Sequence, residues 1–358
     1  MDLANKEGSS VKVPKILVTG GCGFLGSHVC ELFIKKGWRV DAFDNMSKFE
    51  LMRTGYNVDK ARDYNRNFLE SIGVQIQKAD VRDIYALTEC AHSCDYIVHT
   101  AAQPAMTVAL ENPIFDFENN ALGTLNVLET GRLLHLPVAL CSTIHVYGNG
   151  RNNQLCELPT QLMPKRQDSF ALKETAKILT GKITPLHVSK HINELYARAY
   201  QESYNAKSAV FRLTGFYGPR QLGGEDHGWV ANFAIRTACE LPIKIFGTDK
   251  QVRDILYVTD VAKAFELWHD NGCVSGLYNI CGGVSYNTSL KDCLRILAQI
   301  TGKTQSIEML PARTGDLWYF SGNHDKATKT FKWQPTITPE RGIQELVAWI
   351  QENKELFS

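Results

Sequence analysis

A short apolar strand that runs through a glycine-rich turn into a helix is the feature that most constrains this chain. Residues 15–19, KILVT, lead into TGGCGFLGS, and helical apolar spacing continues to residue 37. Three glycines stand at G-x-x-G-x-x-G spacing in the turn: Gly20, Gly23 and Gly26. Residues without a Cβ let the backbone approach a diphosphate, and the helix N-terminus offers free N–H groups. The turn predicts a dinucleotide site that includes Phe24 and Leu25, with a purely structural glycine turn as the alternative.

The rest of the chain alternates apolar strands with helices. Strands are predicted in residues 39–44, 74–80, 96–102, 136–143 and 207–214, with helices that include residues 119–134 and 189–203. Apolar strands alternating with helices are typical of a parallel sheet covered on both faces. The predicted fold class is therefore α/β, a Rossmann doubly wound parallel sheet with a smaller C-terminal substrate-binding domain.

An acidic residue at the end of the second strand bears on the choice of dinucleotide. Asp44 stands eighteen residues after Gly26. A carboxylate there accepts hydrogen bonds from ribose hydroxyls and repels a 2′-phosphate, which favours NAD over NADP. Asn45 follows it, and Asp80 and Val81 end the next strand, where an adenine ring could rest. An ordinary surface aspartate is the alternative for each acid.

The alternation loosens after about residue 214, which suggests where the chain divides. Residues 15–213 are assigned to an NAD-binding domain, to which residues 251–283 return. Residues 214–250 and 284–358 are assigned to the substrate-binding domain, and residues 1–14 to a disordered lead-in. A chain of 358 residues suits two such closely joined domains.

Composition excludes several classes of function. The formal net charge is +1, so no broad field points to nucleic acid or an anionic membrane, and no apolar run is long enough to span one. The first fourteen residues lack the apolar segment of a secretory signal. Ten cysteines without a C-x-x-C pair argue against metal and disulfides and fit thiols in a reducing cytoplasm.

Further motifs then occur in order along the chain: TAAQPAMTVALENPIFDFENNALGTLNVLE, STIHVYG, FRLTGFYGPRQ, EDHGWVANF, GTDKQVRDILYVTDVAKA, YNICGG and RTGD. From about residue 15 onward the chain resembles the extended short-chain dehydrogenase/reductase family, the nucleotide-sugar epimerases and dehydratases. The segments AMT, RQLGGEDHGWV and KQVRD are most similar to those of the CDP-paratose/CDP-tyvelose 2-epimerases.

The resemblance implies NAD and a nucleoside diphosphate sugar, with a CDP-sugar favoured. It implies epimerisation by transient oxidation and re-reduction, at carbon 2 in that subgroup. It also implies a homodimer built on the helices beginning near Asn120 and Lys190, although core packing in a monomer would look similar. The cofactor-binding residues that it implies are Ala101, Ala102, Asn120 and Lys190. The substrate-binding residues that it implies are Gln103, Thr107, Arg220, Trp229, Arg253 and Arg313. The two last arginines would bind the diphosphate through their planar guanidinium groups.

The catalytic positions depart from the family at one place. Thr143 matches the hydroxyl partner of the sugar, and Lys190 matches the lysine of the Tyr-x-x-x-Lys motif, but Leu186 occupies the tyrosine position. Leucine has no proton to exchange. His145, expected on the same side of an extended strand as Thr143, and His187 are the candidate replacements, because imidazole titrates near neutrality.

The leucine at position 186 also allows the alternative that no other residue replaces the tyrosine as the base. The reaction could dispense with that base, or the protein could bind a nucleotide sugar without turning it over. A net NAD-dependent dehydrogenase is a further alternative. Dehydration and decarboxylation are disfavoured, because Ile144 and His145 stand where those enzymes carry acidic residues.

Overall fold

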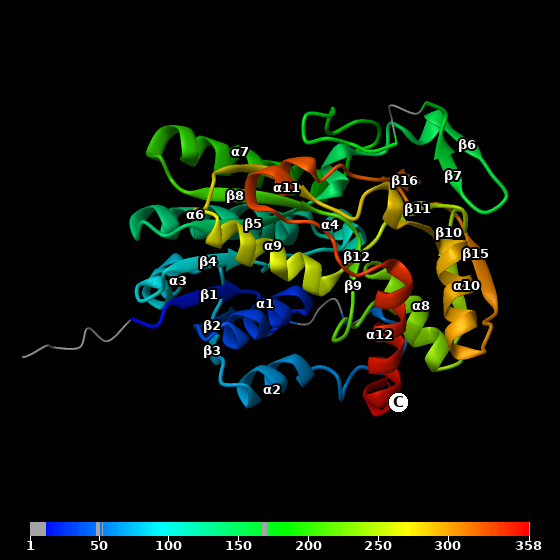
Figure 1. Cartoon of the computed structure of the whole chain (residues 1–358), viewed down its shortest axis with the longest axis horizontal. Coiled ribbons are helices and arrows are strands. Elements are labelled where there is room, and N and C mark those ends of the chain that lie inside the picture. Colours follow the sequence, from blue (N-terminus) through cyan, green and yellow to red (C-terminus); the bar gives the residue numbers. More distant parts are fainter. Residues whose placement is uncertain (1–11, 48–50, 52, 167–169, 358) are drawn as a thin grey trace, which may run out of the picture.

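The computed structural model describes residues 12–47, 51, 53–166 and 170–357. Most of the lead-in expected at residues 1–14 therefore lies outside the described residues. Figure 1 shows a strand-and-helix part on the left and a smaller part on the right, to which α8, α10 and α12 belong.

A seven-stranded, all-parallel sheet confirms the predicted fold class. Its order is β13-β8-β5-β4-β1-β2-β3. The strands are β1 (Lys15–Thr19), β2 (Arg39–Asp44), β3 (Gln75–Lys78), β4 (Tyr96–His99), β5 (Val138–Thr143), β8 (Ser208–Leu213) and β13 (Gly276–Ile280). The order reverses direction between β1 and β4, and ligands of such sheets bind at the carboxyl edge beside that point.

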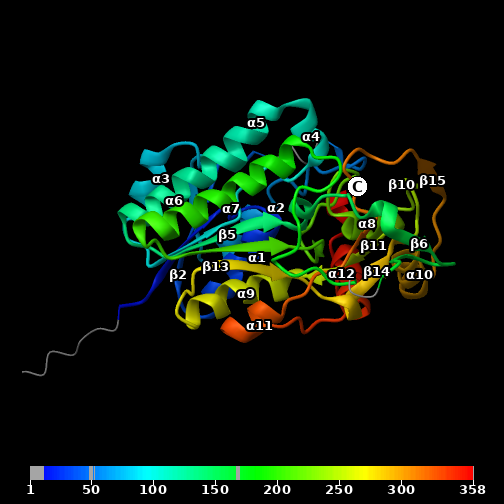
Figure 2. The same cartoon turned by 90° about the horizontal axis from the view of Figure 1, so that it is seen from above.

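Helices cover both faces of the sheet, as Figure 2 shows. One face carries α3 (Ile84–Ala91), α6 (Gly123–Leu133) and α7 (Pro185–Tyr204), and the other carries α1 (Phe24–Lys35), α9 (Val258–Asp270) and α11 (Asp325–Phe331). Within β1 the side chains alternate: Leu17 packs under the first set of helices, whereas Ile16 and Val18 pack under the second. Burial on both faces explains why these strands read as continuous apolar runs.

The smaller part, called the cap below, has a core of its own. It contains α8 (Trp229–Ala238), α10 (Leu290–Thr301), α12 (Pro339–Glu352) and five short strands, with Phe233, Leu297 and Leu346 buried between the helices. The strands are β10 (Ile243–Phe246) paired with β15 (Ile307–Leu310), and β11 (Val252–Asp254) between β14 (Asn287–Ser289) and β16 (Tyr319–Phe320).

The connection between the two parts is less simple than the predicted boundaries. Within the segment expected to return to the NAD-binding domain, α9 and β13 lie on the central sheet, whereas β11 pairs with strands of the cap. Conversely, α11 belongs to the expected cap segment but packs on β13.

The smaller elements are α2 (Tyr64–Ser71), α4 (Met106–Glu111), α5 (Pro113–Phe117), η2 (Glu118–Leu122), η3 (Ile144–Tyr147), β6 (Leu155–Glu157), β7 (Leu162–Pro164), β9 (Phe216–Tyr217) and β12 (Leu256–Tyr257).

Two chemical features complete the description. No described helix has the length and apolar character that crossing a membrane requires. All ten cysteines are free thiols, and none of the described residues gathers into a group of three or more histidine, cysteine or acidic side chains that could hold a metal ion.

Candidate dinucleotide and sugar site

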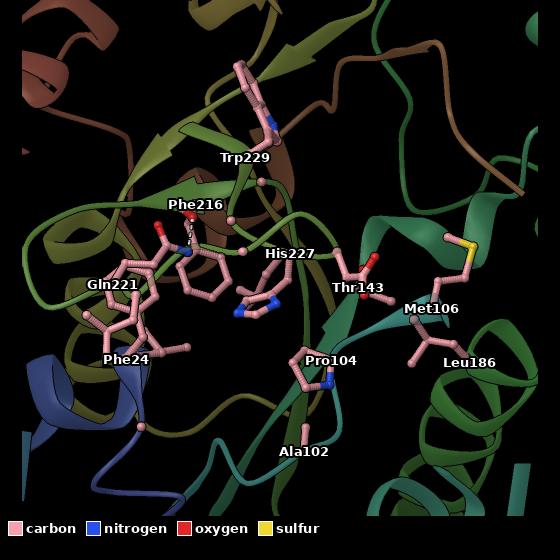
Figure 3. A pocket seen from close by; sticks show the side chains of 18 of the residues that line it. Phe24, Ala102, Pro104, Met106, Thr143, Leu186, Phe216, Gln221, His227 and Trp229 are labelled. Carbon is pink, nitrogen blue, oxygen red and sulfur yellow. Dashed lines mark hydrogen bonds between the residues drawn. The ribbon is translucent and has the colours of Figure 1, made fainter. Parts of the chain in front are cut away.

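A cavity of about 710 Å³ opens at the carboxyl edge of the central sheet and extends beneath the cap. Its size is typical of small-molecule sites. Figure 3 shows Phe24, Phe216 and Gln221 at one end and Thr143, Met106 and Leu186 at the other, with His227 between them. The cavity therefore joins the glycine turn to the region of the expected sugar chemistry.

The glycine turn has the shape that a diphosphate cradle needs. Gly20 has φ +68°, and a Cβ there would stand 2.6 Å from the backbone nitrogen of Ala101. Gly26 lets α1 approach β1, because its Cβ would meet the carbonyl oxygen of Gly20 at 2.1 Å. Of the predicted turn residues, Gly20, Gly23, Phe24 and Leu25 line the cavity, as do Ala101 and Ala102. Gly26 acts behind it, in helix–strand packing.

The acidic residues at the ends of β2 and β3 have different positions. Asp44 lines the cavity with Asn45, and its oxygens accept the backbone N–H groups of Cys22 (3.0 Å) and Met46 (2.8 Å). Val81 also lines the cavity, but Asp80 does not. The carboxylate of Asp80 is held by the guanidinium of Arg82, with two contacts of 2.9 Å, which lowers the pKa of Asp80 to about 2. The structure thus gives Asp80 an anchoring position rather than a place in the cavity wall.

Thr143, Leu186 and Lys190 share one wall of the cavity. Thr143 ends β5, while Leu186 and Lys190 lie one turn apart on α7, on the same face. Lys190 is 7% exposed, and burial lowers the pKa of its ammonium group. Leu186 is 3% exposed and lies at the same end of the cavity as Met106 and Thr143 (Figure 3). At the position where the family resemblance implies a phenol, the cavity is therefore lined by an apolar side chain.

His145 lines the cavity, but not in the way the sequence suggested. The strand ends at Thr143, and residues 144–147 form the 3₁₀ helix η3, so the expected two-residue alternation does not apply. The turn forms because Thr143 Oγ1 accepts the backbone N–H of His145 at 3.2 Å. Burial, followed by the charges of His187 and Arg253, lowers the pKa of His145 to about 3.

His187 lies behind this wall rather than in it. It is 0% exposed and is not among the residues lining the cavity. Its Nδ1 accepts the backbone N–H of Thr184 at 3.0 Å, in the capping box that begins α7. The rings of His145 and His187 stand edge to face with centroids 6.0 Å apart. Any effect of His187 on a ligand must therefore pass through a neighbour.

Asn120 and Gln103 also lie behind the wall. Asn120 is in the π-helix η2, and its side chain makes two hydrogen bonds of 3.0 Å with the backbone of Gln103. Gln103 is fully buried and donates from Nε2 to Asp116 at 3.0 Å. Neither side chain lines the cavity, so the structure does not place Gln103 in the cavity wall. The pair fixes the loop that carries Ala101 and Ala102.

Two of the three predicted arginines are placed as cations facing the cavity. Arg253 and Arg313 both line it. Burial lowers the pKa of Arg253 to about 10, so an anion there would offset an unfavourable buried charge. Arg313 lies over the ring of Phe246, 3.4 Å from its centroid, and donates to the carbonyl oxygen of Glu225 at 2.7 Å.

Arg220 has a different place from the one expected on the sugar side. Its guanidinium contacts α1, donating to Ser27 Oγ at 3.2 Å and Glu31 Oε2 at 2.7 Å. It still borders the cavity, at the glycine-turn end. The remaining predicted substrate residues, Thr107 and Trp229, line the cavity.

Sequence reasoning missed several lining residues of the 213–229 segment. One of them is His227, which stands centrally in Figure 3. Gln221, which follows Arg220 in the motif FRLTGFYGPRQ and was expected near the sugar-binding side, also lines the cavity and donates from Nε2 to the carbonyl oxygen of Phe216 at 3.4 Å. Asp226 makes ion pairs of 3.4 Å with both Arg53 and Arg313. The motif EDHGWVANF had marked this segment, but no local pattern shows which of its side chains face inward.

The fold and cavity together define a dinucleotide-binding α/β protein with a second ligand region beneath its cap. Residues 16–281 match the NAD dependent epimerase/dehydratase family, and the chain belongs to that family. The resemblance recognised in the sequence is thereby confirmed.

Individual relatives agree with this assignment. The CDP-paratose 2-epimerase of Salmonella typhi is 28% identical in an alignment 347 residues long that covers 94% of this chain and 98% of the relative. The solved UDP-glucose 4-epimerase of Thermus thermophilus, in complex with NAD, is 29% identical with a TM-score of 0.77, over 94% of this chain and 99% of that one. The UDP-glucose 4-epimerase of Thermotoga maritima with UDP-glucose is 27% identical with a TM-score of 0.76, over 95% and 99%.

Proposed function

We propose that this chain is an NAD-dependent nucleotide-sugar epimerase. The observation that carries the proposal is a single cavity lined by the glycine turn, by Thr143 and Lys190, and by two arginines of the cap, Arg253 and Arg313. A dinucleotide on the turn and a nucleoside diphosphate under the cap would bring the two reacting groups together beside Thr143.

The residues present fit NAD. Gly20 and Gly23 line the cavity at the turn into α1, where the helix N-terminus offers backbone N–H groups to a diphosphate, and Asp44 lines the cavity at the end of β2. Bound NAD would supply reversible hydride acceptance. Lys190 would hold the nicotinamide ribose, and Thr143 would bind the sugar oxygen at the reacting carbon. Arg253 and Arg313 would hold the sugar diphosphate.

The finer assignment is epimerisation at carbon 2 of a CDP-hexose. Its support is the CDP-paratose 2-epimerase relative, together with the segments AMT, RQLGGEDHGWV and KQVRD. The neighbours that act on UDP-glucose make UDP-sugars the competing substrates.

Leu186 supports a second candidate, a relative that binds a nucleotide sugar with altered chemistry or without turnover. The apolar wall beside Thr143 supplies no proton acceptor at the position where the family resemblance implies one. An active enzyme would have its proton transfer rearranged, and His145, which also lines the cavity, would be a weak base for it because burial lowers its pKa to about 3.

A homodimer in the cytoplasm is part of the proposal. The helices α5 and α7 pack against each other and share a face with exposed apolar side chains. These side chains are Ile114, Phe117, Val188 and Leu195, which are 70%, 51%, 40% and 52% exposed. A second copy of the chain would cover this face. Ten free thiols support a reducing compartment.

Proton NMR of CDP-paratose and CDP-tyvelose incubated with the NAD-loaded protein tests the function. Interconversion of the two sugars, lost in Thr143→Val, is the expected result. An absence of conversion while NAD and the sugar nucleotide both bind would instead support the second candidate.

A further inference from the structure

Thr143 presents a hydroxyl group that is already oriented by its own turn. Its oxygen accepts the backbone N–H of His145, and no described residue accepts a hydrogen bond from its O–H. Because the residue lines the cavity, the O–H group is available to a ligand as a donor.

The neighbouring imidazole of His145 offers a second donor. The Nδ1 of His145 is enclosed without a partner although the residue lines the cavity, so Nε2 is the nitrogen that a ligand can reach. His187 has its own Nδ1 occupied as an acceptor of the Thr184 N–H, which places its proton on Nε2.

These two histidines are complementary. The Nε2–H of His187 and the Nδ1 of His145 are both enclosed without a hydrogen-bond partner, in rings that stand edge to face with centroids 6.0 Å apart, so Nδ1 of His145 can serve as the acceptor of that N–H. A small ring movement or one bridging water would join them. Either link keeps the proton of His145 on Nε2, facing the cavity.

The charged side chains around the Thr143 hydroxyl and the Nε2–H of His145 favour a ligand oxygen that is electron-rich and carries no proton. Lys190, Arg253 and Arg313 are cations that line the cavity, Asp316 lines it within electrostatic reach of Arg253, and Leu186 adds no acceptor. Burial keeps the pKa of His145 near 3, so the ring is neutral at physiological pH. A neutral imidazole with so low a pKa takes up an alcohol proton poorly, but it donates to a carbonyl oxygen without changing its charge.

We propose that the sugar bound in this cavity is a ketone, with its carbonyl oxygen between the Thr143 hydroxyl and the Nε2–H of His145. The ligand class is thus a nucleoside diphosphate ketohexose, in preference to the corresponding alcohol. This inference rests on the proposed function, because it takes the cavity to hold a nucleotide sugar. The site binds and polarises the carbonyl, and His187 acts as a positioning residue that fixes the tautomer of His145.

Isothermal titration of the NAD-loaded protein tests the proposal. The probes are CDP-hexoses carrying a ketone at carbon 2 or carbon 4, each compared with the alcohols produced by borohydride reduction. We expect one ketone to bind at least about tenfold more tightly than its alcohol, which corresponds to roughly 1.4 kcal/mol, the order of one net hydrogen bond. The infrared C=O stretch of the bound, carbon-13-labelled ketone should move to lower frequency.

Substitutions identify the donors. His145→Leu should abolish both the preference and the infrared shift, and His145→Gln, which keeps an N–H donor, should retain much of each. The exposed His92, at the end of α3, supplies a matched control in His92→Gln, which should change neither. Retention of the infrared shift in His145→Leu would overturn the assigned donor, and the Gln variant covers the case in which the Leu variant does not fold.

Two outcomes separate this inference from the proposed function. Equal or weaker binding of both ketones, with epimerisation of the alcohols in the NMR assay, would overturn the ketone preference and leave the epimerase. Binding of NAD without binding of any probe, CDP- or UDP-linked, would overturn both.

Discussion

Glu194 and Arg212 form a buried two-point ion pair one helical turn beyond Lys190. Arg212 Nε donates to Oε1 at 2.9 Å and Nη2 to Oε2 at 2.7 Å, and both residues are at most 8% exposed. Ser142, which precedes Thr143, donates to the same carboxylate at 2.8 Å. The pair therefore ties α7, with Lys190, to the ends of β5 and β8.

Removing the charge of Glu194 should destabilise the fold. Breaking one partner of a buried ion pair leaves an uncompensated charge, so we expect Glu194→Gln to lower the free energy of unfolding by about 3 kcal/mol in urea titrations. The exposed pair Arg198–Glu202 on the same helix gives a matched control, because Glu202→Gln should have no measurable effect. An equal effect of the two variants would contradict the positioning role.

Leu186→Tyr should restore an ordinary proton-transfer geometry. A phenol at this position would stand beside Thr143, one turn from Lys190, whose positive charge lowers the pKa of a nearby hydroxyl. We expect faster reduction of bound NAD by a sugar alcohol, measured as NADH absorbance in single turnover. Leu186→Phe has nearly the same volume without the hydroxyl and should show no gain.

Gly20→Ala should abolish binding of NAD. The new Cβ would collide with the backbone of Ala101, which forms part of the cavity wall. Gly37→Ala is the control: Gly37 also has positive φ, +82°, but its Cβ would meet nothing within 4 Å. Fluorescence titration with NADH should therefore show loss of binding in the first variant only, whereas both lose some stability through backbone strain.

The fold should weaken as the pH falls below about 6.5. Burial lowers the pKa of His28 to about 3, so the unfolded chain binds this proton in a range where the folded chain does not. Stability from this group is present above pH 6.5 and declines toward pH 3, by about 2 kcal/mol between pH 6.5 and 5.

His28→Gln isolates this contribution. An amide N–H keeps the hydrogen bond that Nε2 makes to the carbonyl oxygen of Pro219 at 2.8 Å. Urea unfolding from pH 7 to pH 5 should show a smaller decline in this variant than in the original chain. Parallel curves would mean that folding does not lower the pKa of His28.

Leu195→Asp should yield a monomer if α5 and α7 form the dimer face. A carboxylate at this exposed position would be desolvated in an apolar interface, which is strongly unfavourable. Light scattering after size-exclusion chromatography gives the mass of each form. Tyr85, 86% exposed on α3, supplies the control Tyr85→Asp, which should leave the assembly unchanged.

The sequence by itself determined the central sheet, the glycine turn and the family. Strands buried on both faces have a period and composition that are visible locally, and Gly20 and Gly26 are required by contacts within one βα unit. Six of the seven strands were predicted close to their observed bounds. The strand β13 was not singled out, because it lies after residue 214, where the regular alternation of strands and helices loosens.

Only the tertiary structure decided which candidate side chains face the cavity. Asp80, Gln103, Asn120 and His187 stand in motifs like those of the lining residues, yet hydrogen bonds to Arg82, Asp116 and the backbone of Gln103 and Thr184 hold them behind the wall. The 3₁₀ turn after Thr143 likewise set the direction of His145. Such outcomes depend on partners from distant segments, and a buried polar group takes the partner that satisfies it best, whatever its local sequence suggests.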